Sequence, residues 1–135
     1  MTKIKTYCDA NVLITASKYQ YNKYLKILDD PNREFVSSIF VKLETLPKAH
    51  FHGYNKQVDF LETFFEYVTI WPKAQDLELI SNNALELAKE YDLNAIDALH
   101  LACAIHLNCN EIFSQEKLTK PMYSVPGIKI IHINH

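Results

Sequence analysis

Residues 94–105, NAIDALHLACAI, combine the composition of a buried helix with a single acidic side chain, Asp97. Eight of these twelve residues are aliphatic or alanine, so the segment is apolar on nearly all sides and predicts a helix at the centre of the fold. A carboxylate is costly there, because it loses its hydration if it is buried without a partner. Asp97 either stabilises the first turn of this helix, with Asn94 as the N-cap, or belongs to a functional site.

The rest of the chain alternates short β-rich runs with segments of helical periodicity. The runs that predict strands are 3–8, 34–38, 68–71, 111–113 and 128–133. The segments that predict helices are 9–18, 22–30, 38–46, 54–68, 76–91 and 94–105, and Pro47 is expected to end or kink the third of them. This alternation predicts an α/β fold: a three-layer α/β/α sandwich whose central sheet is mostly parallel.

Length and composition predict one domain that spans residues 1–135, with 48% apolar and 22% charged residues. No apolar run is long enough for a membrane helix, and no secretory signal precedes residue 15, so we expect a cytoplasmic protein without a membrane contact. The three scattered cysteines agree with a reducing compartment. Two glycines in the whole chain exclude the glycine-rich loops that cradle nucleotide phosphates.

Several acids stand where predicted strands end or on the next helical turn. Asp9 follows the first strand, Glu44 lies on the helix after the second, and Glu116 follows the strand at 111–113. Asp9 could be an ordinary N-cap and Glu44 an exposed glutamate. In parallel sheets, however, ligands bind beyond the carboxyl ends of the strands. Converging carboxylates need protons or cations to coexist, and hard oxygen ligands favour Mg²⁺ or Mn²⁺.

Four stretches in this order resemble the PIN-domain family, and most closely the small VapC-like ribonucleases of toxin–antitoxin pairs. They are YCDANVLI (7–14), VSSIFVKLETL (36–46), LNAIDALHLACA (93–104) and EIFSQEK (111–117). The resemblance implies helices around a parallel sheet and a divalent-metal-dependent endoribonuclease that hydrolyses RNA phosphodiester bonds, as the toxin of such a pair. It also implies one or two Mg²⁺ or Mn²⁺ ions as cofactors.

The resemblance assigns roles to particular residues of this chain. The acids that would bind metal and carry catalysis are Asp9, Glu44, Asp97 and Glu116, and the polar neighbours that would position substrate are Asn11, Ser38 and Ser114. Two places depart from the family pattern: Ala10 stands where threonine is common, and Ser114 and Glu116 stand where threonine and aspartate are common. These departures leave an alternative open, a catalytically inactive PIN-like module that binds protein or RNA.

The partners implied are an RNA substrate, an antitoxin protein whose tail covers the acidic groove, and a second copy of the chain in a homodimer. Other functions fit less well: a haloacid-dehalogenase-type phosphatase needs a second aspartate where Asn11 stands. His50, His52 and the histidines at 132–135 lack the further ligands of a zinc site. We interpret His100 as the buried partner of a nearby carboxyl or carbonyl group, with catalysis as the lesser alternative.

Overall fold

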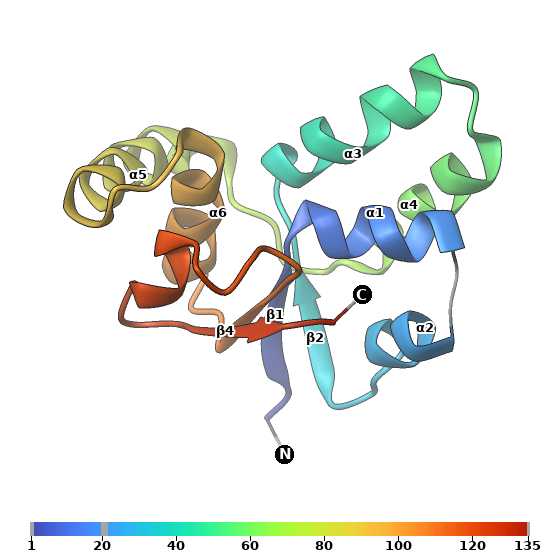
Figure 1. Cartoon of the computed structure of the whole chain (residues 1–135), viewed down its shortest axis with the longest axis horizontal. Coiled ribbons are helices and arrows are strands. Elements are labelled where there is room, and N and C mark those ends of the chain that lie inside the picture. Colours follow the sequence, from blue (N-terminus) through green and yellow to red (C-terminus); the bar gives the residue numbers. More distant parts are fainter. Residues whose placement is uncertain (1, 20–21, 135) are drawn as a thin grey trace.

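The strands form a parallel sheet that runs through the middle of the molecule (Figure 1). The computed structural model describes residues 2–19 and 22–134, and within them the sheet has four strands in the order β2-β1-β3-β4. Their bounds are β1 Ile4–Cys8, β2 Arg33–Val36, β3 Glu111–Ser114 and β4 Lys129–His132. Each neighbouring pair is parallel, so the strands β1 and β3 end side by side at the same edge.

Helices cover both faces of this sheet (Figure 1). One face carries α1 Ala10–Tyr19, α2 Asn22–Leu28, α3 Ile39–Phe51 and α4 Asn55–Tyr67. The other carries α5 Leu77–Tyr91 and α6 Ala95–His106, and the short 3₁₀ turns are η1 Ala74–Asp76 and η2 Pro121–Ser124. The predicted α/β class with a parallel sheet between helices is therefore confirmed.

Helix α6 is the central helix that its apolar composition predicts. Leu101 is fully buried, and Ala98 and Ala102 are 1% and 2% exposed. Asn94 caps the helix, because its side chain accepts the Asp97 backbone N–H at 2.9 Å. Asp92 ends α5 in the left-handed conformation (φ 56°), which an aspartate tolerates, and this tight reversal lays α6 against α5.

The core lies on both sides of the two inner strands. Every residue of β3 is buried, as expected for a parallel strand covered by helices on both faces. Tyr7 of β1, Ile112 of β3 and Leu13 of α1 are 0% exposed. None of the helices in the described part of the chain has the length and apolar character needed to cross a bilayer.

One local prediction needs correction, and one of the two effects expected of a proline is excluded. The run 68–71 is not a strand: Ile70 makes only an isolated bridge to Val36, because the chain touches the end of the edge strand β2 and then meets Pro72. Pro47 does not end its helix, since α3 continues to Phe51. The carbonyl that Pro47 leaves without a helical N–H belongs to Leu43, whose side chain is on the solvent side at 62% exposed.

Candidate metal centre

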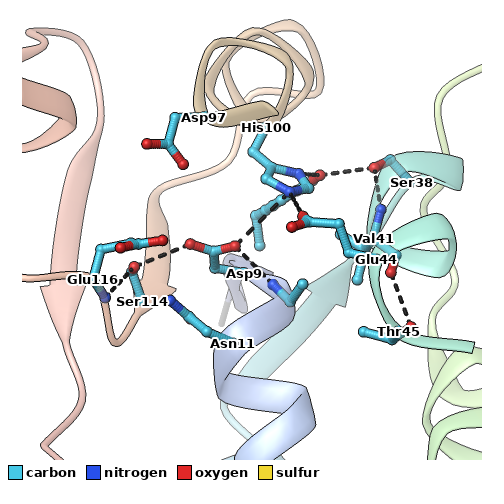
Figure 2. Close-up of polar contacts among 12 residues, drawn as sticks. Asp9, Asn11, Ser38, Val41, Glu44, Thr45, Asp97, His100, Ser114 and Glu116 are labelled. Carbon is cyan, nitrogen blue, oxygen red and sulfur yellow. Dashed lines mark hydrogen bonds and ion pairs between the residues drawn. The ribbon is translucent and has the colours of Figure 1, made fainter. Parts of the chain in front are cut away.

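Asp9 lies at the carboxyl end of β1, beside the end of β3. Its backbone N–H donates to the carbonyl of Phe113 at 2.9 Å, which continues the pairing of the two strands by one residue. Its Oδ2 accepts the Ser114 hydroxyl at 3.0 Å, and its Oδ1 accepts the Ala10 backbone N–H at 2.7 Å (Figure 2). Asp9 therefore contributes to the start of α1, but it is also held in place by β3, and it is only 5% exposed.

Three carboxylates from separate segments converge at this edge of the sheet. Asp97 projects from the first turn of α6 and Glu116 from the segment after β3, and both face Asp9 (Figure 2). One oxygen from each of the three residues lies within 4.8 Å of the others, close enough for a single cation to bind all three. Asp97 is also 5% exposed, so two of the three acids are buried.

A second group shares Asp9 but includes a nitrogen ligand. One oxygen each from Asp9 and Glu44 and one ring nitrogen of His100 lie within 4.8 Å of one another. His100 Nε2 is 2.5 Å from Glu44 Oε1 and 3.8 Å from Asp9 Oδ1. The interpretation of His100 as the buried partner of a carboxyl group is confirmed, although the sequence did not indicate which carboxyl group. The other three predicted acids, Glu44, Asp97 and Glu116, thus lie around Asp9, together with His100.

The electrostatics of the site disfavour negative charge when no cation is bound. Burial raises the pKa of Asp9 from 3.8 to about 6, against the opposing effects of His100 and the Ser114 hydrogen bond. Burial likewise raises the pKa of Asp97, while Lys120 and His100 act to lower it. Removal of these carboxylates from water therefore makes a proton, or a cation, favourable at the site.

The three predicted positioning residues have defined contacts in the structure (Figure 2). Ser114 binds Asp9 and also accepts the Glu116 backbone N–H at 3.0 Å, so one hydroxyl links two of the acids. Asn11 Oδ1 accepts the Gln115 backbone N–H at 3.1 Å, which ties α1 to the same segment. Ser38 caps α3 by accepting the Val41 N–H, and its Oγ also lies 2.7 Å from the Tyr7 hydroxyl, so neither of these contacts is with the acids.

Other candidate sites lie elsewhere or have different partners. A hollow of about 1280 Å³ opens beside α2, α4 and the amino end of β2, at the opposite end of the strands from the acids. His50 faces Glu62 at 3.5 Å, and His52 stacks on Tyr54. Lys42 lies over the rings of Trp71 and Phe65, at 4.7 and 5.6 Å from their centroids.

Hydrogen bonds to both its N–H and its carbonyl hold the backbone of Glu116. The hydroxyl of Tyr123, in η2, donates to the Glu116 carbonyl at 2.7 Å and lies 3.2 Å from His132 Nδ1. Together with the Ser114 contact to the Glu116 N–H, this fixes the backbone from which the carboxylate projects. The substitution of glutamate for the aspartate common in the family therefore leaves the carboxylate in reach of Asp9 and Asp97.

Comparison with known proteins agrees with this architecture. A search of curated proteins gives no significant match. A chain in the crystal structure of VapBC2 from Rickettsia felis, bound to a DNA fragment from their promoter, superposes with a TM-score of 0.77 at 15% identity, covering 97% of this chain and 100% of that one. A chain of a toxin–antitoxin complex from Klebsiella pneumoniae gives 0.70 at 21% identity, covering 93% and 95%. The PIN domain model matches residues 6–120, so this chain belongs to the PIN domain family.

Proposed function

We propose that the protein is a divalent-metal-dependent endoribonuclease that hydrolyses RNA phosphodiester bonds, as the toxin of a toxin–antitoxin pair. The observation that carries the proposal is the convergence of Asp9, Asp97 and Glu116, whose oxygens lie within 4.8 Å of one another. These acids come from the end of a strand, the start of a helix and a loop, and the parallel pairing of β1 with β3 brings the first and the last of these segments together. Carboxylates placed so closely repel each other unless a cation or protons intervene.

The residues present fit Mg²⁺ or Mn²⁺, which prefer hard oxygen ligands. Asp9, Asp97 and Glu116 would hold one ion, and Glu44 would serve as a ligand beside Asp9 or as a ligand of a second ion. Bound there, the ion lowers the pKa of a coordinated water and offsets charge on the scissile phosphate. Asp9 bridges the two groups of ligands, since it belongs to both.

The surroundings of the acids support a phosphate substrate. Lys120 acts on the pKa of Asp97, so a cation lies close to that carboxylate. Without the four site acids, 12 acidic residues stand against 14 lysines and arginines, so the rest of the protein is slightly basic. We propose that Ser114 and Asn11 keep the strand ends in register around the substrate.

We further propose an antitoxin partner, a homodimer, one domain over residues 1–135, and action in the cytoplasm. Two similar structures were solved as VapBC or toxin–antitoxin complexes, which supports the first of these. Cys8, Cys103 and Cys109 are all free thiols, which agrees with a reducing compartment. Copurification of a small partner from the native host tests the antitoxin, and the mass in solution tests the dimer: a strictly monomeric mass contradicts it.

The test is cleavage of a structured RNA pool by the purified chain with Mg²⁺ or Mn²⁺, with chelator, and with Asp97→Asn. Asp59→Asn is the matched control, because Asp59 is an exposed acid on α4 outside both groups of ligands. We expect metal-dependent cleavage by the wild type and the control, and at least a hundredfold loss in Asp97→Asn. Metal-dependent cleavage that persists in Asp97→Asn would refute the assigned site.

Calorimetry with Mn²⁺ separates the remaining alternatives. A wild type that binds Mn²⁺ but cuts no RNA in the pool has a metal site and a narrow substrate range. A wild type that neither cuts RNA nor binds Mn²⁺ is the catalytically inactive PIN-like module, and the proposed function is then wrong.

A further inference from the structure

A buried chain of hydrogen bonds runs from the start of α3 through β1 and α6 to the edge of the metal centre. The Tyr7 hydroxyl lies 2.7 Å from Ser38 Oγ and 2.6 Å from His100 Nδ1. His100 Nε2 then lies 2.5 Å from Glu44 Oε1 (Figure 2). Tyr7 and Ser38 are 0% exposed and His100 is 1% exposed, so the two hydrogen bonds of the Tyr7 hydroxyl are shielded from water.

When the His100 imidazole is neutral, the chemistry of these groups allows only one direction of donation along the series of hydrogen bonds. An ionised carboxylate can only accept, so Nε2 must carry the hydrogen that faces Glu44. Nδ1 is then an acceptor and takes the Tyr7 hydroxyl hydrogen, which leaves the Tyr7 oxygen to accept from Ser38. The Glu44 carboxylate therefore sets the tautomer of His100, with the hydrogen on Nε2, and the buried Tyr7 hydroxyl satisfies Nδ1, the acceptor nitrogen of that tautomer.

The same geometry distinguishes two roles for His100. A histidine ligand would leave its nitrogen lone pair facing the cation, but Nε2 is already engaged by the Glu44 oxygen at 2.5 Å. Glu44, in contrast, gains from a hydrogen bond that limits its rotamers. Its side chain is 36% exposed on α3, where a glutamate samples several rotamers and loses entropy when it binds a ligand.

We propose that His100 is a positioning residue: through Nε2–H it holds the Glu44 carboxylate beside Asp9, and Tyr7 holds the His100 ring in place by donating to Nδ1. This inference rests on the proposed function, because it assumes that Glu44 serves a metal bound at Asp9. Groups that orient a ligand in this way contribute about 10- to 100-fold to metal affinity. His100 therefore acts through Glu44 and does not itself bind the ion.

The first experiment measures Mn²⁺ affinity by calorimetry in Tyr7→Phe, His100→Leu and His100→Gln. We expect affinity about 10-fold weaker in Tyr7→Phe and about 10- to 100-fold weaker in His100→Leu. His100→Gln carries an amide N–H near the position of Nε2 and is expected to recover most of the loss. Thr6→Val is the matched control, since it removes a buried hydroxyl of the same strand that donates to Glu111 and not to the site.

A double-mutant cycle separates positioning from a structural effect. If Tyr7 and His100 act through Glu44, Tyr7→Phe has no further effect on Mn²⁺ affinity in a Glu44→Gln background. Additive losses would mean that Tyr7→Phe disturbs the site by another route, and would overturn the inference. Thermal unfolding of each variant confirms that the affinities are measured on folded protein.

Electron spin-echo spectroscopy of the Mn²⁺-bound wild type needs no variant. We expect no directly coordinated nitrogen, and a coordinated imidazole would overturn the positioning role. Failure of the proposed function gives a different result, namely a wild type that binds no Mn²⁺. If Tyr7→Phe and His100→Leu bind Mn²⁺ as tightly as the wild type does, the present inference is refuted, whereas the proposed nuclease function is not.

Discussion

Replacing Asp9 with asparagine is expected to stabilise the metal-free protein at neutral pH, although it removes a residue of the metal centre. Asp9 is 5% exposed, and burial raises its pKa from 3.8 to about 6. At pH 7.5 the folded wild type must therefore hold a desolvated negative charge that the unfolded chain exposes to water. Asparagine has nearly the same shape without that charge, and its oxygen can still accept the Ala10 N–H.

The size of the effect follows from the pKa of Asp9. A rise from 3.8 to about 6 corresponds to about 3 kcal/mol, at about 1.4 kcal/mol for each pH unit. Between these two pH values the folded state binds more protons than the unfolded state. The contribution of Asp9 is thus fully present below pH 4 and is lost as the pH rises through 6. Relative to wild type, Asp9→Asn should gain about 3 kcal/mol between pH 4 and pH 7.5.

Urea unfolding in the presence of chelator, at intervals from pH 4 to pH 7.5, measures this difference. Asp59→Asn is the control and should show no such trend, because Asp59 is exposed. Mn²⁺ at one thousand times its dissociation constant should reverse the order, since it stabilises only the chain that binds it, by about 4.1 kcal/mol. A difference between Asp9→Asn and wild type that does not change with pH would refute the desolvation argument.

Two further predictions concern α6. Asn94→Ala removes the acceptor of the Asp97 N–H and should lower the free energy of unfolding by about 1 kcal/mol in urea, with weaker Mn²⁺ binding because the turn that carries Asp97 frays. Unchanged stability would show that the cap is dispensable. Leu101→Ala empties a fully buried position and should cost about 3 kcal/mol in the same assay, while the folded variant still binds Mn²⁺. A loss below about 1 kcal/mol would mean that Leu101 is not part of a packed core.

Local pattern was sufficient for much of the fold. The apolar composition of 94–105 predicts α6 within one residue at each end, and Asn94 is its N-cap. Alternation of strand and helix signals predicted the parallel sheet, because parallel strands need crossover helices. The prediction of a strand at 68–71 was wrong for a physical reason: the composition of this run favours a strand, but only Ile70 forms a bridge, to Val36.

The site was predictable only in part. Strand ends and the family resemblance indicated which acids would gather, and Asp9, Asp97 and Glu116 do lie together. The partner of His100 was not predictable, since Glu44 is 56 residues away and the hydrogen-bond pattern depends on how α3 packs against α6. The same limit applies to Ser38, whose neighbour Tyr7 lies on β1, 31 residues away, and whose cap role emerges only with the bounds of α3.

The sheet order has a consequence for a nascent chain. The site at Asp9 is complete only with Ser114 and Glu116, and β1 can pair with its inner neighbour β3 only after β3 has been made. The Asp9–Ser114 contact spans 105 residues, so a ribosome must translate as far as residue 116 before the three carboxylates can meet. If the protein cuts RNA as proposed, a nascent chain shorter than this lacks a complete metal centre, so the topology delays cleavage until β3 and the segment after it have been made.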